Sequence, residues 1–294
     1  MNTNSEILFM EPHFVPLIWG SESWGISAYK GASSTIRNGK FKGKNLRELW
    51  ETNRELFGNL GMAEFPHLIK FIDANKDLSV QVHPDDNYAQ KVEAEPYGKK
   101  ECWFILDCEP GTTIIIGHKS KDRESMKKCI DENRWDDVLN EFEIHPGDFF
   151  QINPGTIHAI KGGTKILETQ QTSDLTYRLY DYGRLENGSP RELHIEKALD
   201  VIDYEGGTPE HKNYFNTTDP KTQLYKCDKY CVYLLNVGGA QSYDFNVPFL
   251  NCSVIEGSGK IDGTEIKQGD NFILPYSYNN FEISGSLKLI CSHV

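Results

Sequence analysis

Short runs of alternating apolar and polar residues, separated by glycine turns, dominate the chain. The stretch LSVQVHPDD, from Leu78 to Asp86, alternates strictly and then stops at Pro84. In VIEGSGKIDGTEI, near the C-terminus, three glycines separate short alternating runs at the spacing of a tight meander. Alternation of this kind is typical of antiparallel strands, and many short strands with glycine turns predict a β-sandwich or β-barrel.

Helical patterns interrupt this β pattern at about residues 41–58, 120–142 and 189–202. The first includes NLRELWETNRELFG, which we expect to end at Gly58. The third, SPRELHIEKALDVI, has Ser189 as its expected N-cap and Pro190 in its first turn. These segments predict helical insertions and covers around a mainly β core.

Two segments far apart in the chain share a pattern. Residues 143–160 are EIHPGDFFQINPGTIHAI and residues 265–283 are EIKQGDNFILPYSYNNFEI, so each contains Glu-Ile, two further residues, Gly-Asp and a Phe before a later Pro. This similarity indicates an internal repeat. In each copy, Gly-Asp ahead of alternating apolar residues predicts a turn that leads into a strand.

The polar, turn-rich stretch at residues 203–222 is the best candidate for a linker. We therefore expect an N-terminal domain at residues 1–205 and a C-terminal domain at residues 206–294, with one copy of the repeat in each. The length of 294 residues by itself allows either two ordinary domains or one large one.

Composition and charge narrow the classes of function. A hydrophobic fraction of 38% with 25% charged residues is typical of a globular protein, and no apolar run is long enough to cross a bilayer. The net charge of −12 argues against nucleic acid or an anionic membrane as the main partner. An anionic small molecule can bind only where the fold gathers cations.

The cysteines and the N-terminus both predict a cytoplasmic protein. Seven scattered cysteines, an odd number, do not form a disulfide framework in a chain of this size, and reduced thiols fit a reducing compartment. The first ten residues, MNTNSEILFM, lack the basic flank and the long apolar segment of a secretory signal.

Polar side chains in three distant segments form a candidate metal site. In LSVQVHPDD, a period of two directs the two valines to one face of a strand and Gln81 and His83 to the other. Glu101 lies at the start of an apolar strand in KKECWFIL. His158 follows the turn NPGTIH in the first copy of the repeat, whereas the second copy has no histidine at the matching place. This difference indicates a site that is kept in one domain and lost in the other.

Two imidazoles, one carboxylate and one amide oxygen suit a borderline metal such as Zn²⁺, with a position left open for water or substrate. Two histidines and one carboxylate also hold Fe(II) in oxygenases. Gln81 favours zinc, because a fourth protein ligand takes a position that an oxygen-activating iron needs. The alternative is that all four residues are buried polar groups that hydrogen-bond without a metal.

Four motifs together closely resemble those of type I mannose-6-phosphate isomerase (phosphomannose isomerase) in its shorter bacterial form: SVQVHPDD, GKKE, PGTIHAI and QQTSDLTYRLYDYGR. The segment VPLIWG, residues 15–20, is similar to the N-terminal part of that family. The motifs occur in the family's order from about residue 10 to residue 200. The second copy of the repeat is similar to the family's C-terminal cupin-like domain.

The resemblance implies a fold of two jelly-roll cupin β-barrel domains with helical insertions, of which the C-terminal one lacks the metal site. It implies that Gln81, His83, Glu101 and His158 bind one Zn²⁺ per chain. The implied reaction interconverts mannose 6-phosphate and fructose 6-phosphate by proton transfer between C1 and C2 through an enediol(ate). One departure concerns cupins in general, because Gln-x-His replaces the usual His-x-His.

The reaction needs a base that moves a proton between adjacent carbons, and cations that bind the phosphate. Lys99 is two residues before Glu101, so both side chains fall on one face of an extended segment. We expect Lys99 to shuttle the proton with help from Glu168, which the resemblance matches to an acidic residue of the family's pocket. The resemblance also matches Arg178 to the family's active-site arginine. Arg178, with Lys99, would bind the substrate, and Arg178 would contact phosphate oxygens or stabilise the enediolate.

Other interpretations of these residues stay open. Lys99 and Glu168 are the kind of residue that more often forms solvated salt bridges, and Arg178 has carboxylates in its own segment with which it could pair. A non-catalytic metal- or sugar-binding cupin is disfavoured because binding alone requires no base. An Fe(II) cupin oxygenase is disfavoured by Gln81.

Overall fold

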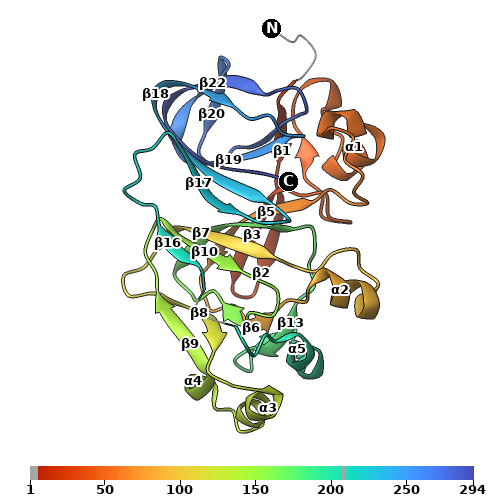
Figure 1. Ribbon diagram of the computed structural model, residues 1–294, viewed down its shortest axis with the longest axis vertical. Coiled ribbons are helices and arrows are strands. Elements are labelled where there is room, and N and C mark those ends of the chain that lie inside the picture. Colours follow the sequence, from red (N-terminus) through yellow and green to blue (C-terminus); the bar gives the residue numbers. More distant parts are fainter. Residues whose placement is uncertain (1–5, 207–208) are drawn as a thin grey trace. The chain divides into compact units, whose positions relative to one another are not determined.

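A computed structural model describes residues 6–206 and 209–294 (Figure 1). Residues 1–5, where no secretory signal is expected, and residues 207–208 of the expected linker lie outside the described residues. Most elements of the described part are strands, which form three larger sheets and one two-stranded sheet. The predicted mainly β fold is confirmed.

The chain folds into two compact units that alternate along the sequence. One unit consists of residues 15–22 and 71–215 and is called the site unit. The other consists of the residues up to Phe14 together with 23–70 and 216–294, and is called the C-terminal unit. The sequence predicts contiguous domains at 1–205 and 206–294 instead, and this domain assignment stays a prediction.

Two sheets build most of the site unit, and strands β2, β3 and β5 each have residues in both units. The inner sheet has the order β13-β6-β11-β8-β9, with strands at Tyr177–Tyr180, Val80–Val82, His158–Ala159, Thr113–His118 and Leu139–Glu143. The other sheet has the order β16-β10-β7-β12-β5-β3-β2, with strands at His211–Asn213, Asp148–Ile152, Glu101–Cys108, Thr164–Gln171, His67–Ala74, Gly20–Ile26 and His13–Leu17.

The two faces of the inner sheet contact different groups of residues. One apolar cluster draws residues from both sheets, including Ile105 on β7 and Ile116 on β8. A second cluster joins the opposite face of the inner sheet to helices α3, α4 and α5, at Arg123–Asp131, Trp135–Val138 and Ile195–Val201. Val80 and Val82 are fully buried in this second cluster. Because alternate side chains of a strand point to opposite faces, Gln81 faces the other side.

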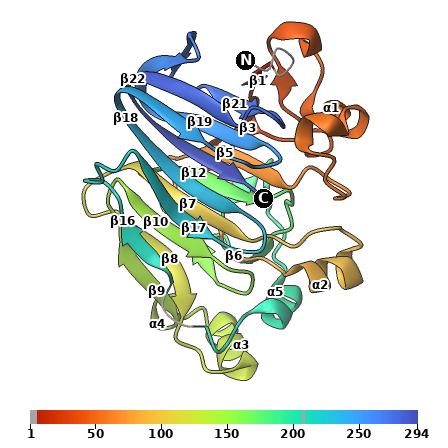
Figure 2. The same cartoon turned by 45° about the horizontal axis from the view of Figure 1, so that its top comes forward.

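The C-terminal unit is built on one eight-stranded sheet. Its order is β17-β18-β22-β19-β21-β1-β4, with β20 paired to β19, and the strands lie at Lys221–Lys226, Cys231–Asp244, Asn280–His293, Leu250–Ile261, Asn271–Leu274, Leu8–Glu11, Thr35–Ile36 and Thr264–Lys267. Figure 2 shows the long strands β18, β22 and β19 side by side. Strands β19 and β20 form the expected meander, with Asp262 and Gly263 at positive φ in a two-residue turn.

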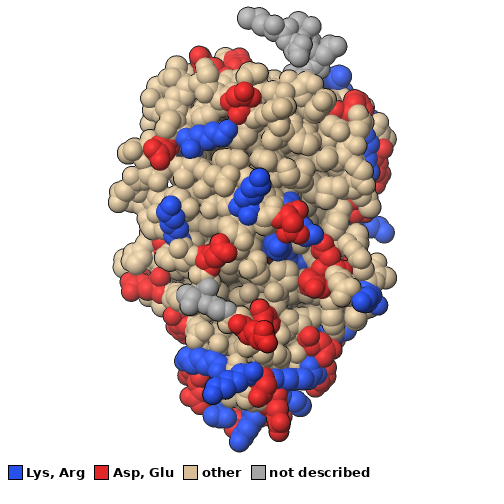
Figure 3. Space-filling model, viewed as in Figure 1, with Lys and Arg blue, Asp and Glu red and all other residues tan. Residues whose placement is uncertain are grey.

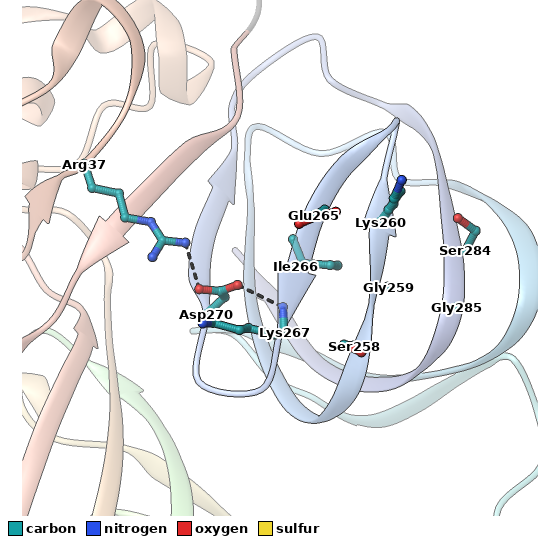
Figure 4. A pocket seen from close by; sticks show the side chains of 10 residues that line it. All are labelled: Arg37, Ser258, Gly259, Lys260, Glu265, Ile266, Lys267, Asp270, Ser284 and Gly285. Atoms are coloured by element: carbon teal, nitrogen blue, oxygen red, sulfur yellow. Dashed lines mark hydrogen bonds and ion pairs between the residues drawn. The ribbon is translucent and has the colours of Figure 1, made fainter.

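The two copies of the repeat form the same turn. Gly147 and Gly269 have φ of 87° and 89°, a conformation that glycine adopts without strain. The Asp148 carboxylate accepts a hydrogen bond from the His145 amide at 2.7 Å, and the Asp270 carboxylate accepts one from Lys267 N at 2.9 Å (Figure 4). Since the local hydrogen bonds match as well as the residues, the repeat is structural.

In the C-terminal unit this turn borders a cavity of about 690 Å³ (Figure 4). Asp270 there forms an ion pair with Arg37 at 2.7 Å. The lining residues in the described part of the chain include lysines, serines and glycines but no histidine. Among these described residues, the cavity has carboxylates at Glu265 and Asp270 but lacks the imidazole ligands of the candidate metal site.

The first predicted helical segment is confirmed in outline. Helix α1, Leu46–Thr52, begins after Asn45, whose side chain accepts a hydrogen bond from the Glu48 amide. The 3₁₀ turns η1, Gly39–Phe41, and η2, Arg54–Phe57, flank it. The segment ends at Gly58, which has a φ of 67°, as the sequence predicts.

The other two predicted helices are shorter than expected. The segment predicted at 120–142 ends in strand β9, because residues 139–143 pair with β8 and this tertiary pairing outweighs helix propensity. The helix predicted from Ser189 begins at Ile195, because Ser189–Pro190 form β15 and pair with β14, Leu185–Glu186. The turn between them is Asn187-Gly188, both at positive φ, which is a hairpin signal that the helix prediction overlooked.

Two further short elements and the expected linker complete the description. Helix α2, Asp86–Tyr88, continues into a π-helical turn, η3, at Ala89–Glu93. Within the stretch expected to be a linker, β16 pairs with β10 in the site unit. That part of residues 203–222 is therefore a strand rather than a free connection.

Charged side chains of both signs are intermixed over α3 and α4 on the face shown in Figure 3. Arg123 pairs with Asp200 at 2.6 Å and with Glu196 at 2.8 Å, and Arg134 pairs with Glu132 at 2.7 Å. These pairs balance the local charge. In the described part of the chain, the helices are too short or too polar to span a bilayer.

Candidate metal centre

The four predicted ligands lie close together inside the site unit. Strands β6, β7 and β11 carry three of them, and the fourth directly follows β6. Gln81 on β6 lies directly opposite His158 on β11, so the two side chains share one face of the inner sheet. His83 follows β6, and Glu101 is the first residue of β7. Candidate ligand atoms of His83, Glu101 and His158 all lie within 4.8 Å of one another, and all three residues are buried. These four residues are called the candidate metal centre.

Backbone carbonyl groups orient both imidazole rings. His83 Nδ1 lies 2.7 Å from the Leu175 carbonyl oxygen, and His158 Nδ1 lies 2.9 Å from that of Thr156. A carbonyl can only accept a hydrogen bond, so each Nδ1 carries the proton and each Nε2 keeps its lone pair. Burial lowers the pKa of His158 to about 4, which keeps its ring neutral near pH 7. Neutral imidazoles held in this way are typical metal ligands.

The Glu101 carboxylate lies opposite these two lone pairs. Its Oε1 is 3.4 Å from His158 Nε2, and its Oε2 is 3.5 Å from His83 Nε2. Glu101 is fully buried; Lys99 Nζ forms an ion pair with its Oε2 at 3.1 Å, and no hydrogen bond to Oε1 is present among the described residues. A buried carboxylate beside two neutral imidazoles is costly unless a cation neutralises it. Lys99 supplies one positive charge, and the two imidazole lone pairs that face the carboxylate complete a donor set that fits a divalent metal ion.

Gln81 lies next to both imidazoles. Its amide nitrogen is 3.2 Å from His158 Nε2 and 3.5 Å from His83 Nε2, while its oxygen accepts a hydrogen bond from Ser79 Oγ at 3.4 Å. A rotation of the amide by half a turn exchanges the two atoms. The oxygen would then face the imidazoles, as a metal ligand must.

The three predicted catalytic residues lie in the same unit. Lys99 Nζ is 3.1 Å from Glu101 Oε2, and only 4% of Lys99 is exposed. Glu168 on β12 is opposite Trp103 on β7, so the two side chains share one face of the sheet. Glu101 lies two residues before Trp103 and points to the same face. Arg178 on β13 is opposite Gln81 and shares its face of the inner sheet. The register thus directs Glu168 and Arg178 toward the side of the candidate metal centre, and the ion pair with Glu101 places Lys99 there.

Arg178 does not form the salt bridges that were its alternative role. Asp181 binds Arg184 and Arg191 instead, the latter at 2.6 Å. In the part of the chain that the structure describes, neither Asp174 nor Asp181 forms an ion pair with Arg178, and Arg178 Nε is buried without a hydrogen-bond partner. Burial and the nearby Arg191 lower the pKa of Arg178. A half-buried guanidinium that forms no ion pair among the described residues is suited to bind an anion.

Trp103 is a site residue that the sequence interpretation missed. Its indole Nε1 donates a hydrogen bond of 3.0 Å to Glu168 Oε1, and its ring packs edge-on against His158 at 5.4 Å between centroids. Trp103 is buried and joins a predicted ligand to a predicted catalytic carboxylate. The sequence did contain a signal for this role: Trp103 lies two residues after Glu101, so the two side chains point to the same face of the strand.

Comparison with known proteins identifies the family. Residues 19–102 match the model of the phosphomannose isomerase type I catalytic domain, and residues 220–294 match that of the mannose-6-phosphate isomerase cupin domain. Mannose-6-phosphate isomerase ManA of Bacillus subtilis is 40% identical over 313 residues, covering 99% of each chain. The mannose-6-phosphate isomerase of Streptococcus mutans is 38% identical, covering 98% of each chain.

Solved structures support the same assignment. The mannose 6-phosphate isomerase of Bacillus subtilis matches with a TM-score of 0.92 at 38% identity, over 99% of this chain and 100% of that one. Variants of the phosphomannose isomerase of Salmonella typhimurium match with TM-scores from 0.76 to 0.78 at 14% identity, which concerns the fold alone. The predicted cupin fold is confirmed, and the chain belongs to the type I mannose-6-phosphate isomerase family.

Proposed function

We propose that this protein interconverts mannose 6-phosphate and fructose 6-phosphate, using one divalent metal ion held by Gln81, His83, Glu101 and His158. The observation that carries the proposal is the buried His-Glu-His cluster with Lys99 beside its carboxylate, in a chain of this family. A sugar phosphate is accordingly the proposed substrate. The proposed location is the cytoplasm, as predicted from the sequence.

Zinc is the proposed metal. Two neutral imidazoles, a carboxylate and an amide oxygen make a mixed nitrogen and oxygen set that zinc accepts. When bound, the ion would supply a Lewis acid that polarises or orients the sugar oxygens at C1 and C2. Gln81 favours zinc over an oxygen-activating iron, because its amide oxygen would take a fourth position.

Lys99 is the proposed proton shuttle. Isomerisation from the aldose removes the proton from C2 to give an enediol(ate) and returns a proton to C1, so one base on one side of the sugar serves both steps. Lys99 is buried at the candidate metal centre and has a flexible side chain, which suits movement between neighbouring carbons. Glu168, held by Trp103, is proposed to assist.

Arg178 is proposed to bind the anionic part of the substrate. Its guanidinium shares a face of the inner sheet with Gln81 and carries no ion pair among the described residues. It can therefore form a bidentate contact with phosphate oxygens or stabilise the charge that develops on the enediolate.

A coupled assay from mannose 6-phosphate to fructose 6-phosphate tests the proposed function. Chelation is expected to remove activity, and Zn²⁺ added back is expected to restore it, because the ion would supply charge stabilisation that side chains cannot replace. Metal analysis of the purified protein accompanies the assay. If the zinc-loaded protein shows no turnover, it is a binding module; if it consumes oxygen with Fe(II), it is an oxygenase. Either result contradicts the isomerase.

Trp103→Phe is expected to lower kcat about 10- to 100-fold with little change in metal content or KM. The variant removes the indole donor to Glu168 but keeps an aromatic ring near His158, and loss of such an orienting hydrogen bond has effects of this size. Steady-state kinetics and metal analysis measure the effect. Trp19→Phe is the matched control, because Trp19 is buried in the same apolar cluster as Trp103. Equal losses in both variants would indicate a packing role only.

A further inference from the structure

The site unit has a cavity on the helix-covered face of the inner sheet. It has a volume of about 320 Å³, and Val80 and Ile115 contribute to its lining. Val80 is adjacent to Gln81 on β6 and therefore points away from the candidate metal centre. Tyr180, opposite Val80 on β13, also lines this cavity. The thickness of the sheet thus separates the cavity from the proposed catalytic residues.

Three aromatic side chains line this cavity in a row. Trp135 from α4 stacks on Tyr180 with a centroid distance of 4.9 Å and an interplanar angle of 24°. Tyr180 in turn contacts Tyr182 at 4.8 Å with an angle of 59°. Together with the buried Val80 and Ile115, these rings give the cavity an apolar wall that is suited to a flat, partly apolar ligand.

Tyr182 has two properties that packing does not explain. Its φ is 57°, a conformation that bulky side chains rarely adopt, and the Arg184 guanidinium lies 5.1 Å from the centre of its ring. Its hydroxyl group is buried. A buried polar group is expected to have a partner, and none of the described residues supplies one.

Charged side chains of both signs complete the lining. Asp77, Asp136 and Glu141 offer carboxylate acceptors, and Lys119 and Lys161 offer ammonium donors. Lys161 and Glu141 already pair at 2.6 Å. Since the lining holds three carboxylates and two ammonium groups, it does not favour a phosphate or another anion. It favours a neutral ligand with several hydroxyl groups that both donate and accept.

We propose that this cavity is a second ligand site that binds a neutral sugar in its pyranose form. The C–H face of the ring lies against the aromatic wall, and the hydroxyl groups bind Tyr182 Oη and the charged groups of the lining. A cavity of this size is at the lower end of the range for small-molecule sites, about 300–1,000 Å³, which fits one or two sugar rings. Unlike the proposed substrate, the ligand carries no phosphate.

Methyl α-D-mannopyranoside is the probe, because it keeps its ring closed and has no phosphate. Saturation-transfer NMR and calorimetric titration are expected to detect binding to the full-length protein. Tyr182→Phe removes only the hydroxyl group and is expected to raise Kd about five- to tenfold, the effect of one neutral hydrogen bond. Isomerase activity is expected to stay unchanged, since the cavity that Tyr182 lines is on the opposite face of the sheet from the proposed catalytic residues. A thermal melt of the variant checks that the fold is intact.

Two control variants locate the bound sugar. Lys260→Ala alters the cavity of the C-terminal unit (Figure 4) and is expected to leave binding unchanged. His158→Ala alters the candidate metal centre and is likewise expected to leave binding unchanged. If His158→Ala abolishes binding and Tyr182→Phe does not, the sugar occupies the metal centre and the proposal is wrong. Absence of binding at millimolar concentrations, or binding of adenosine in place of the sugar, also overturns it.

Discussion

Alanine in place of His158 is expected to release the metal ion and to lower the isomerisation rate at least about a thousandfold. Loss of a Lewis acid removes several kcal/mol of charge stabilisation, and each 1.36 kcal/mol corresponds to a factor of ten in rate. His158 is central to the site because its Nδ1 is fixed by the Thr156 carbonyl and its Nε2 faces Glu101. Metal content per chain and the coupled assay measure the two effects. His83→Ala is expected to give the same pair of losses.

The histidine His145 provides a matched control within the same copy of the repeat. Its side chain is 65% exposed and lies at the turn before β10, so His145→Ala is expected to keep both metal and activity. Circular dichroism and thermal melting separate metal loss from unfolding. If the His158→Ala protein is folded and retains metal and turnover, the four residues do not form the catalytic site.

The sequence predicted which face of its strand each candidate ligand takes, because that face depends on local rules, whereas the pairing of β6 with β11 that brings Gln81 and His158 together is long-range. The period of two on β6 separates Gln81 and His83 from the valines, and the Gly-Asp turn places the strand that leads to His158. Both copies of the repeat keep this turn, as Asp148 and Asp270 show, so the turn serves the fold. The histidine occurs in one copy only, so it is separable from the fold and indicates function.

Contacts between distant segments could not be predicted in the same way. The position of Arg178 depends on the pairing of β13 with β6, two strands far apart in the sequence, and nothing local fixes that register. Residues 139–143 likewise form a strand and not a helix because they pair with β8. Helix α5 begins later than predicted for a different reason. The Asn187-Gly188 hairpin signal was present in the sequence, but the prediction gave more weight to Ser189 as a helix N-cap.

The role of Trp103 was predictable in part from the local sequence and in part only from strand pairing. Its face was predictable from Glu101, two residues before it, but its partner Glu168 lies on β12 and is brought opposite by strand pairing. An aromatic residue on the inner face of a β-barrel is usually part of the core. Here Trp103 both packs and donates a hydrogen bond, so burial alone does not describe its role.

Lys99→Met is expected to keep the metal bound while proton exchange between C2 of the sugar and solvent falls about 10²- to 10⁴-fold, the usual contribution of a positioned base. Methionine is similar in length but has no group that accepts a proton. Metal retention is expected because the Lys99 ammonium lies 3.1 Å from Glu101 Oε2 and competes with a cation for that oxygen. The methionine variant should therefore bind Zn²⁺ at least as tightly. Deuterium incorporation at C2, followed by NMR in heavy water, measures the exchange.

Two matched variants decide whether the effect belongs to Lys99. Lys100→Met changes the neighbouring, more exposed lysine and is expected to leave exchange unchanged. Glu168→Gln is expected to slow exchange less than Lys99→Met, because Glu168 only assists in the proposed mechanism. If exchange continues at the normal rate in Lys99→Met and stops in Glu168→Gln, the base is the carboxylate that Trp103 holds. In that case Lys99 acts as a cation for the substrate, since its buried ammonium beside Glu101 would then have no role in moving the proton.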